Sequence, residues 1–159
     1  MIEEIEQVAH AAVTDLFSTM LGCALEPCPV TSVVISEPHI AGAVGLVGKM
    51  TGVVYLYLTA SFARRATCQL LGVRDQDLQG DEMINDAVGE LANIIVGQLK
   101  TELTNRGVSC SVTVPSVVRG NRFSISTSTA GGRVVLPFRV HLHPEVVVEV
   151  FVKSLELAA

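Results

Sequence analysis

The sequence predicts an α+β fold, with a mainly antiparallel sheet of about six strands packed against a long central helix, an N-terminal helix and a short helix. Apolar residues recur at helical spacing in three stretches, and they alternate with polar residues along the last third of the chain. Of the 159 residues, 49% are hydrophobic and 17% are charged, which favours a compact fold over disorder. No linker or repeat divides the sequence, so we expect residues 1–159 to form a single domain.

The first half of the chain is expected to contain two helices with strands between them. From about Ile2 to Leu21, apolar residues lie three and four positions apart, as on one face of a helix. A second, short helix is expected from Phe62 to Leu71, capped by Ser61 and ended by Gly72. Between the helices, β-branched and aromatic residues favour strands at Val33–Ile35, Gly42–Met50 and Thr51–Thr59, with a tight turn near Lys49–Gly52.

The long helix is predicted from about Glu82 to Asn105. Asp81 is a suitable N-cap, and Gly107 lies just beyond the end. At 1.5 Å per residue this helix would be roughly 36 Å long. Its apolar residues form one stripe that is expected to face the sheet, namely Ile84, Val88, Leu91, Ile95 and Leu99.

The last third of the chain alternates with a period of two residues. This pattern is typical of antiparallel strands that have one face on helices and the other toward water. Val108, Cys110, Val112 and Val114 are expected to face inward, whereas Glu145 and Glu149 are expected to face water. The four predicted strands are Val108–Val114, Phe123–Ser128, Leu136–His143 and Val146–Lys153.

Charge and hydropathy exclude several classes of protein. Eleven Lys and Arg against 16 Asp and Glu give a net charge of −5, and no basic cluster is present, so nucleic-acid binding is disfavoured. No uncharged apolar run approaches 18 residues, so we expect no membrane-spanning helix. The acidic start of the chain, Met1–Glu6, does not resemble a signal peptide, and we expect a cytoplasmic protein.

The common catalytic and metal-binding motifs are absent from the sequence. It contains no GxxxxGK[ST], HExxH or GxSxG pattern. The spacing of Cys23 and Cys28 is a weak metal signal, because no second pair of ligands follows it. We therefore expect no metal site, and we expect these cysteines, with Cys68 and Cys110, to be buried, reduced thiols.

The Glu-x-x-Asn pattern occurs three times in the long helix, at Glu82–Asn85, Glu90–Asn93 and Glu102–Asn105. At about 100° per residue, only the middle pair lies opposite the apolar stripe, where a partner could reach both side chains. Asp86 and Gly97 flank this pair and complete a D-x3-E-x2-N-x3-G pattern. From the residues alone, an ordinary solvated helix face is favoured over a binding site.

The segment Asp86–Gly97, DAVGELANIIVG, resembles the signature of the CheC/CheX/FliY family of chemotaxis phosphatases. The segment Gly45–Leu56, together with Ala63 and the Leu-Leu-Gly that ends the short helix, is also similar to this family. Members with two active helices carry two copies of the signature. The single well-placed copy here resembles the CheX-like branch, whose members are homodimers.

The resemblance implies an activity and a partner. Members of the family hydrolyse the aspartyl-phosphate of a CheY-like response regulator, which supplies the Mg²⁺, so this chain would need no cofactor of its own. Asn93 would position the attacking water, and Glu90 would pair with the active-site lysine of the receiver. Gly89 and Gly97 would let the receiver approach the helix, although a packing role toward the sheet is an equal alternative. Asp86 would have a supporting role, through the solubility of the helix or a contact at the rim of the site.

Two other functions remain open. The chain could be a non-catalytic module that docks on or sequesters a receiver through the same helix, although such a module would not need the amide of Asn93. It could also be a small structural dimer without a receiver partner. Val147 and Phe151 interrupt the polar face of the last strand, and they could form a subunit contact or lie under a covering helix.

Overall fold

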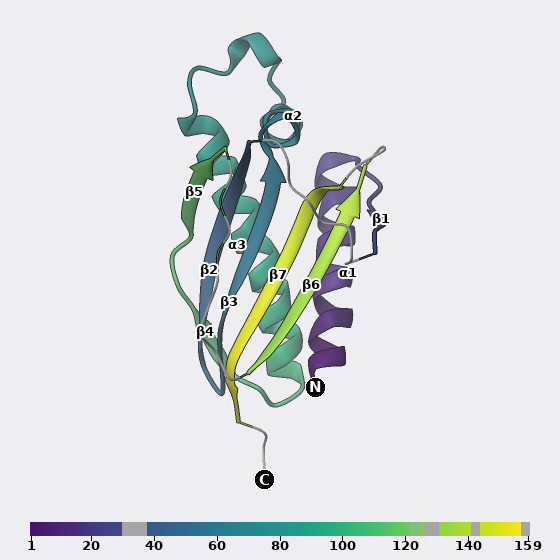
Figure 1. Ribbon diagram of the computed structural model, residues 1–159, viewed down its shortest axis with the longest axis vertical. Coiled ribbons are helices and arrows are strands. Elements are labelled where there is room, and N and C mark those ends of the chain that lie inside the picture. The colour runs from purple at the N-terminus through teal and green to yellow at the C-terminus, as the bar shows by residue number, and fades with distance from the viewer. Residues whose placement is uncertain (30–37, 122, 124, 126–130, 141–143, 157–159) are drawn as a thin grey trace.

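The structure, a computed structural model, describes residues 1–29, 38–121, 123, 125, 131–140 and 144–156. One seven-stranded sheet forms a layer, and the helices lie together behind it (Figure 1). The predicted α+β class is therefore confirmed. The predicted strand at Val33–Ile35 and the serines and histidines between 124 and 143 that were assigned to strands lie outside the described residues.

The helices match the sequence pattern closely. The N-terminal helix α1 (Ile2–Leu21) and the long helix α3 (Glu82–Asn105) have the predicted bounds. The short helix α2 (Ala60–Leu71) begins earlier than expected, because Thr59 rather than Ser61 caps it. The hydroxyl of Thr59 accepts a hydrogen bond from the Phe62 amide at 3.3 Å, and the positive φ of Gly72 ends the helix as predicted.

The sheet is built around two long hairpins. Each strand pairs with its neighbours in an antiparallel direction, and the order is β1-β6-β7-β3-β2-β4, with β5 also paired to β2. The hairpin turn predicted near Lys49–Gly52 is formed at Lys49. The strands are β1 (Glu26–Pro27), β2 (His39–Gly48), β3 (Met50–Thr59), β4 (Cys110–Val112), β5 (Ser116–Gly120), β6 (Gly132–Arg139) and β7 (Pro144–Leu155).

The segment after α3 departs from the predicted strand. Val108 and Cys110 are buried as expected, but Val112 and Val114 are 37% and 84% exposed. The inward alternation fails because the pairing with β2 is interrupted between Val112 and Ser116 and its register shifts there by one residue, so the chain continues along β2 in the same direction as a second strand, β5. Phe123 and Ile125, which were also assigned to a strand, belong to none.

The core lies between the sheet and the helices. The valines at alternate positions of β7, namely 146, 148, 150 and 152, face this core as predicted. Helix α3 contributes Leu91, Ile95 and Leu99, each at most 1% exposed, and each such burial stabilises the fold by about 1.5–3 kcal/mol. Helix α3 contacts β2, β3, α1 and α2, and it is therefore the central helix of the layer.

The other face of the sheet, turned toward the viewer in Figure 1, has its own aromatic cover. The Tyr57 hydroxyl donates to the Glu149 carboxylate at 3.3 Å, and Arg133 forms an ion pair with the same carboxylate. Burial, reinforced by this carboxylate, raises the pKa of Tyr57 far above its usual value, so Tyr57 remains a donor. The prediction that Glu145 and Glu149 face water is wrong, because each is only 5% exposed.

Val147 and Phe151 are covered within the subunit. They are 5% and 7% exposed, and no helix in the described ranges covers them. Instead the Tyr55 ring meets the Phe151 ring edge-on, with centroids 5.8 Å apart, and the Arg133 guanidinium lies 5.5 Å from the Phe151 centroid. These two residues therefore do not indicate a subunit contact.

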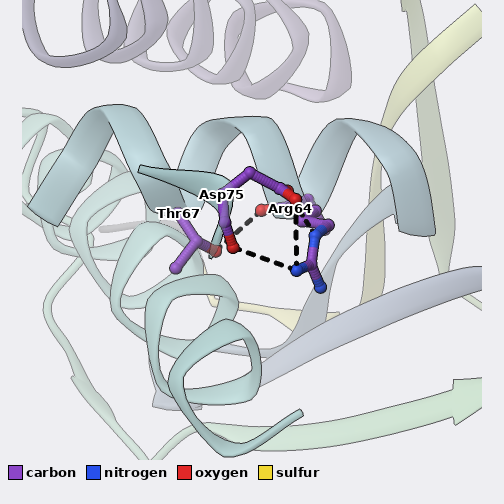
Figure 2. Close-up of polar contacts among 4 residues, drawn as sticks. Arg64, Thr67 and Asp75 are labelled. Carbon is purple, nitrogen blue, oxygen red and sulfur yellow. Dashed lines mark hydrogen bonds and ion pairs between the residues drawn. The ribbon is translucent and has the colours of Figure 1, made fainter. Parts of the chain in front are cut away.

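The connection from α2 to α3 is held by side chains that were not predicted. It contains a short 3-10 helix, η2 (Asp75–Asp77), and Figure 2 shows the Arg64 side chain of α2 turned toward Asp75. Arg64 forms an ion pair with the Asp75 carboxylate and also donates to its backbone carbonyl at 3.1 Å. This contact ties the connection to α2 and so helps to fix where α3 begins.

Substitutions at two separate glycines test how closely α3 packs on the sheet. An added Cβ at Gly42 in β2 would lie 2.9 Å from Ala92 Cβ and 3.2 Å from the Val88 carbonyl oxygen, so Gly42→Ala should push α3 outward. We expect it to reduce the free energy of unfolding by about 1–3 kcal/mol, as overpacking does. Urea and thermal unfolding would measure this.

Gly89→Ala is the matched control on α3. Its Cβ would meet Val117 and Pro115 at 3.6 and 3.7 Å, which is ordinary contact, and alanine favours a helix by about 1 kcal/mol over glycine. The two variants should therefore change stability in opposite directions. Equal stability of Gly42→Ala and the wild type would show that the close packing of α3 on β2 is not required.

Candidate active site

The start of α3 is fixed by an arginine from β5. Asp81 precedes the helix as predicted, but its side chain does not cap it. Instead the Asp81 carboxylate pairs with Arg119 at 3.1 Å, and Arg119 also donates to Asn85 Oδ1 at 2.7 Å. Two charge-assisted contacts thus hold the first turn of α3 against β5. Sequence reasoning missed Arg119, because β5 itself was not predicted.

The three Glu-x-x-Asn pairs now differ in their surroundings. The amide oxygen of Asn85 is occupied by Arg119, so the first pair serves the structure of the helix start. The third pair, Glu102–Asn105, is exposed in the last turn of α3. The middle pair, Glu90–Asn93, lies in the body of the helix, where α3 packs on the core.

The predicted site residues Asp86, Glu90, Asn93 and Gly97 share the outer face of α3. Asp86 and Glu90 are exposed, and Asn93 and Gly97 are half-buried, while the intervening Leu91 is completely buried on the opposite face. The structure thus brings these four residues together on one helix face, as the spacing predicted.

The polar side chains of this face have no partner within the described part of the chain. Glu90, Asn93 and Asp86 form no hydrogen bond or ion pair there. An exposed carboxylate and an amide that are one helical turn apart, and uncommitted, can both bind to groups of another molecule. Since the core residues behind them are buried, the backbone that carries them is held in place.

The two glycines of the predicted site have different surroundings. Gly89 is buried and faces Val117 and Pro115 near β5, so it belongs to the packing of α3 on the sheet. Apart from its chain neighbours and the backbone of its own helix, Gly97 has no heavy atom within 4 Å of where its Cβ would be. Of the two alternatives left open by the sequence, packing applies to Gly89 and an open surface applies to Gly97.

The chemistry available on this face is limited. It offers the carboxylates of Asp86 and Glu90 and the carboxamide of Asn93. Among the described residues, no group of three or more His, Cys, Asp or Glu side chains could hold a metal ion. All four cysteines are free thiols, but the prediction that they are buried is wrong for three of them: Cys110 is buried, whereas Cys23, Cys28 and Cys68 are partly exposed. These carboxylates and this amide can orient a ligand or a water through hydrogen bonds.

None of the helices in the described ranges has both the length and the apolar character needed to cross a membrane.

The comparisons with known proteins agree with this fold. A CheX structure from Desulfovibrio desulfuricans is 29% identical and aligns over 94% of this chain and 99% of its own, with a TM-score of 0.78. A CheX from Borrelia burgdorferi, solved in a complex with CheY, BeF3 and Mg²⁺, is 20% identical and aligns over 93% of this chain and 97% of its own, with a TM-score of 0.77.

A curated relative is similar over a shorter stretch. The CheY-P phosphatase CheX of Thermotoga maritima is 28% identical over 94 residues, which are 58% of this chain and 60% of the relative. The match therefore spans less than two thirds of the relative's length.

A family model gives the broadest sequence match. The model described as chemotaxis phosphatase CheX matches residues 40–139, which include β2, β3 and the whole of α3. This match covers more than half of the chain and contains every residue of the outward face described above. The chain belongs to the CheX family of chemotaxis phosphatases.

Proposed function

We propose that this chain is a phosphatase that hydrolyses the aspartyl-phosphate of a CheY-like response regulator. The observation that carries the proposal is the uncommitted Glu90–Asn93 pair on the outer face of a helix that is packed into the core. The family and the name of the Thermotoga relative, a CheY-P phosphatase, support it. The Borrelia relative, solved with CheY, is an example of the same kind of partner on the same fold.

Asn93 would act on the attacking water. In an acyl phosphate the phosphorus is already reactive. The rate of hydrolysis is therefore limited by the placement of a water in line with the bond to the aspartyl oxygen. The amide oxygen of Asn93 can accept a hydrogen bond from that water without placing another negative charge beside the phosphoryl group. Attack breaks the bond between phosphorus and the acyl oxygen, which regenerates the receiver's aspartate and releases inorganic phosphate.

Glu90 would fix the register of docking. It lies about one turn before Asn93 on the same face, so it can pair with the active-site lysine of the receiver while Asn93 reaches the phosphoryl group. Asp86 is one turn further from Asn93 and would contact the rim of the interface. The Mg²⁺ that neutralises the phosphoryl charge would stay bound to the receiver. Glu90 and Asp86 would contact groups of the receiver around that ion.

A binding module that lacks catalysis is the alternative from a different class. It would use the same helix face and would retain Glu90, but an alanine in place of Asn93 would serve it equally well. The retained amide therefore favours the enzyme.

The proposed phosphatase would act in the cytoplasm, because response regulators act on the cytoplasmic side of the membrane.

We also propose a homodimer, as in the CheX-like branch, formed by joining two sheets at their β2–β4–β5 edge. Since Val147 and Phe151 are covered, the apolar surface of this edge supports the dimer instead. The valines exposed there are Val47, Val112, Val114 and Val118, at 57%, 37%, 84% and 44%. Single exposed apolar residues are common, but four on one sheet edge indicate an interaction surface.

The proposed dimer predicts the mass of the protein in solution and a substitution that should separate the two subunits. Sedimentation equilibrium should give twice the 16.9 kDa of one chain, and Val114→Lys should restore one chain by placing a charge in the contact. Leu71→Lys, at another exposed apolar position, is the control and should remain dimeric. A wild-type mass of 16.9 kDa over the whole concentration range would exclude the dimer.

The catalytic role of Asn93 is tested by Asn93→Ala. Because the variant loses the acceptor for the attacking water, phosphate release from a phosphorylated receiver should slow by about 10²-fold or more, while receiver binding stays nearly intact. Asn105→Ala removes the same amide from the exposed third pair, and it should behave as wild type. Equal rates for Asn93→Ala and wild type would leave only the binding module.

The docking role of Glu90 is tested by Glu90→Gln, which keeps the shape of the side chain and removes its charge. Receiver affinity and turnover should both fall, and the affinity difference from wild type should shrink at high salt, because an exposed ion pair is screened. Glu82→Gln, in the first turn of the same helix, is the control. An unchanged affinity of Glu90→Gln at low salt would argue against the lysine pairing.

A further inference from the structure

A groove of about 640 Å³ runs between α1 and α3 on the helical side of the molecule. The two helices lie side by side in opposite directions, and Glu4 near the start of α1 pairs with Arg106 after the end of α3 at 3.5 Å. Val8, Ala12 and Ile94 contribute apolar surface to the groove, and the polar part of its lining includes Asp15, Glu102 and Arg106. The lining of the groove is thus mixed, with both apolar and charged residues.

The groove continues the outward face of the candidate active site. Gly97 belongs to both, and Ile94, which directly follows Asn93, also lines the groove. From Asn93 to Gly97 the distance along the helix axis is only about 6 Å, at 1.5 Å per residue. A folded domain of about 100 residues has a radius of gyration near 13 Å, so any domain centred on Asn93 must also cover Gly97.

Gly97 is not required by the fold of this chain. A glycine within a helix costs about 1 kcal/mol of stability relative to alanine, and here no neighbouring atom excludes a Cβ. On the opposite wall of the groove stands Ala11, which is exposed and also small. Gly97 and Ala11 are small residues on two facing helices, and Gly97 lowers the stability of its own helix. Both features fit the close approach of a segment from another molecule.

We propose that the receiver docks with a segment next to its phosphorylated aspartate inserted in this groove, and that Gly97 and Ala11 determine how closely it approaches. The inference rests on the proposed function for the identity of the partner. The apolar part of the lining fits an apolar side chain of that segment, and Asp15 and Glu102 fit a basic one beside it, since Arg106 is already paired with Glu4. The groove would therefore select among receivers, whose phosphorylation sites share one chemistry.

The test fills the groove from each wall separately and measures binding rather than hydrolysis. The probe is a receiver from the same genome, activated with beryllofluoride and Mg²⁺, and calorimetry gives its Kd. Gly97→Leu on α3 and Ala11→Leu on α1 should each weaken binding about tenfold or more. Gln69→Leu, which adds the same exposed side chain to α2 outside the groove, should not change the Kd.

Gly97→Ala supplies a second measurement that does not depend on a large side chain. It should raise the melting temperature by about 2–4 °C and still weaken receiver binding, because the gain in helix stability and the loss of close approach have opposite consequences. This combination also excludes misfolding as the cause of weaker binding. Unchanged Kd values for Gly97→Leu and Ala11→Leu would overturn the groove proposal.

The two proposals can fail separately. If wild type releases phosphate from the receiver but filling the groove leaves the Kd unchanged, the phosphatase function stands and the groove has no role. If filling the groove weakens binding but wild type releases no phosphate, the groove is a docking site on a module without catalysis. If no receiver of the genome binds the wild type, both proposals are wrong.

Discussion

At Gly42 the central helix lies so close to β2 that a single added carbon would come within 2.9 Å of Ala92. This contact sets the position of α3 relative to the sheet, and Leu91, Ile95 and Leu99 then fill the core below it. Because those residues are buried, helical geometry places Glu90 and Asn93 on the opposite, outward face of α3. The presentation of the site is therefore a consequence of how the core packs.

A side chain held in this way suits the work proposed for it. Positioning a water requires an acceptor that does not move much, and a site on a helix that is backed by core residues is more precise than one on a loop. In the proposed reaction the reactive bond, the metal ion and the lysine would all belong to the partner, so this chain would contribute geometry. Selectivity among partners would then come from the surface around the amide, which includes the α1–α3 groove.

The sequence predicted the helices better than the edge of the sheet. The bounds of α1 and α3 follow from a repeat of three and four residues over many turns, and so does the outward direction of Glu90 and Asn93. The prediction missed β5, because a one-residue shift in the pairing with β2 between Val112 and Ser116 divides a segment whose alternating valines suggested one strand. The contacts of Arg119 and Glu149 also could not be predicted, since their partners lie far away in the sequence and only the fold brings them together.

The most direct test of the central claim is to locate the Asn93 amide in a complex. A crystal structure of this chain with a receiver that carries beryllofluoride and Mg²⁺ would show the acyl-phosphate mimic and the water in line with it. The Asn93 Oδ1 atom should lie about 2.7–3.2 Å from that water, with Glu90 beside the receiver's lysine. An Asn93 side chain that stays in solvent, while another group holds the water, would contradict the assignment.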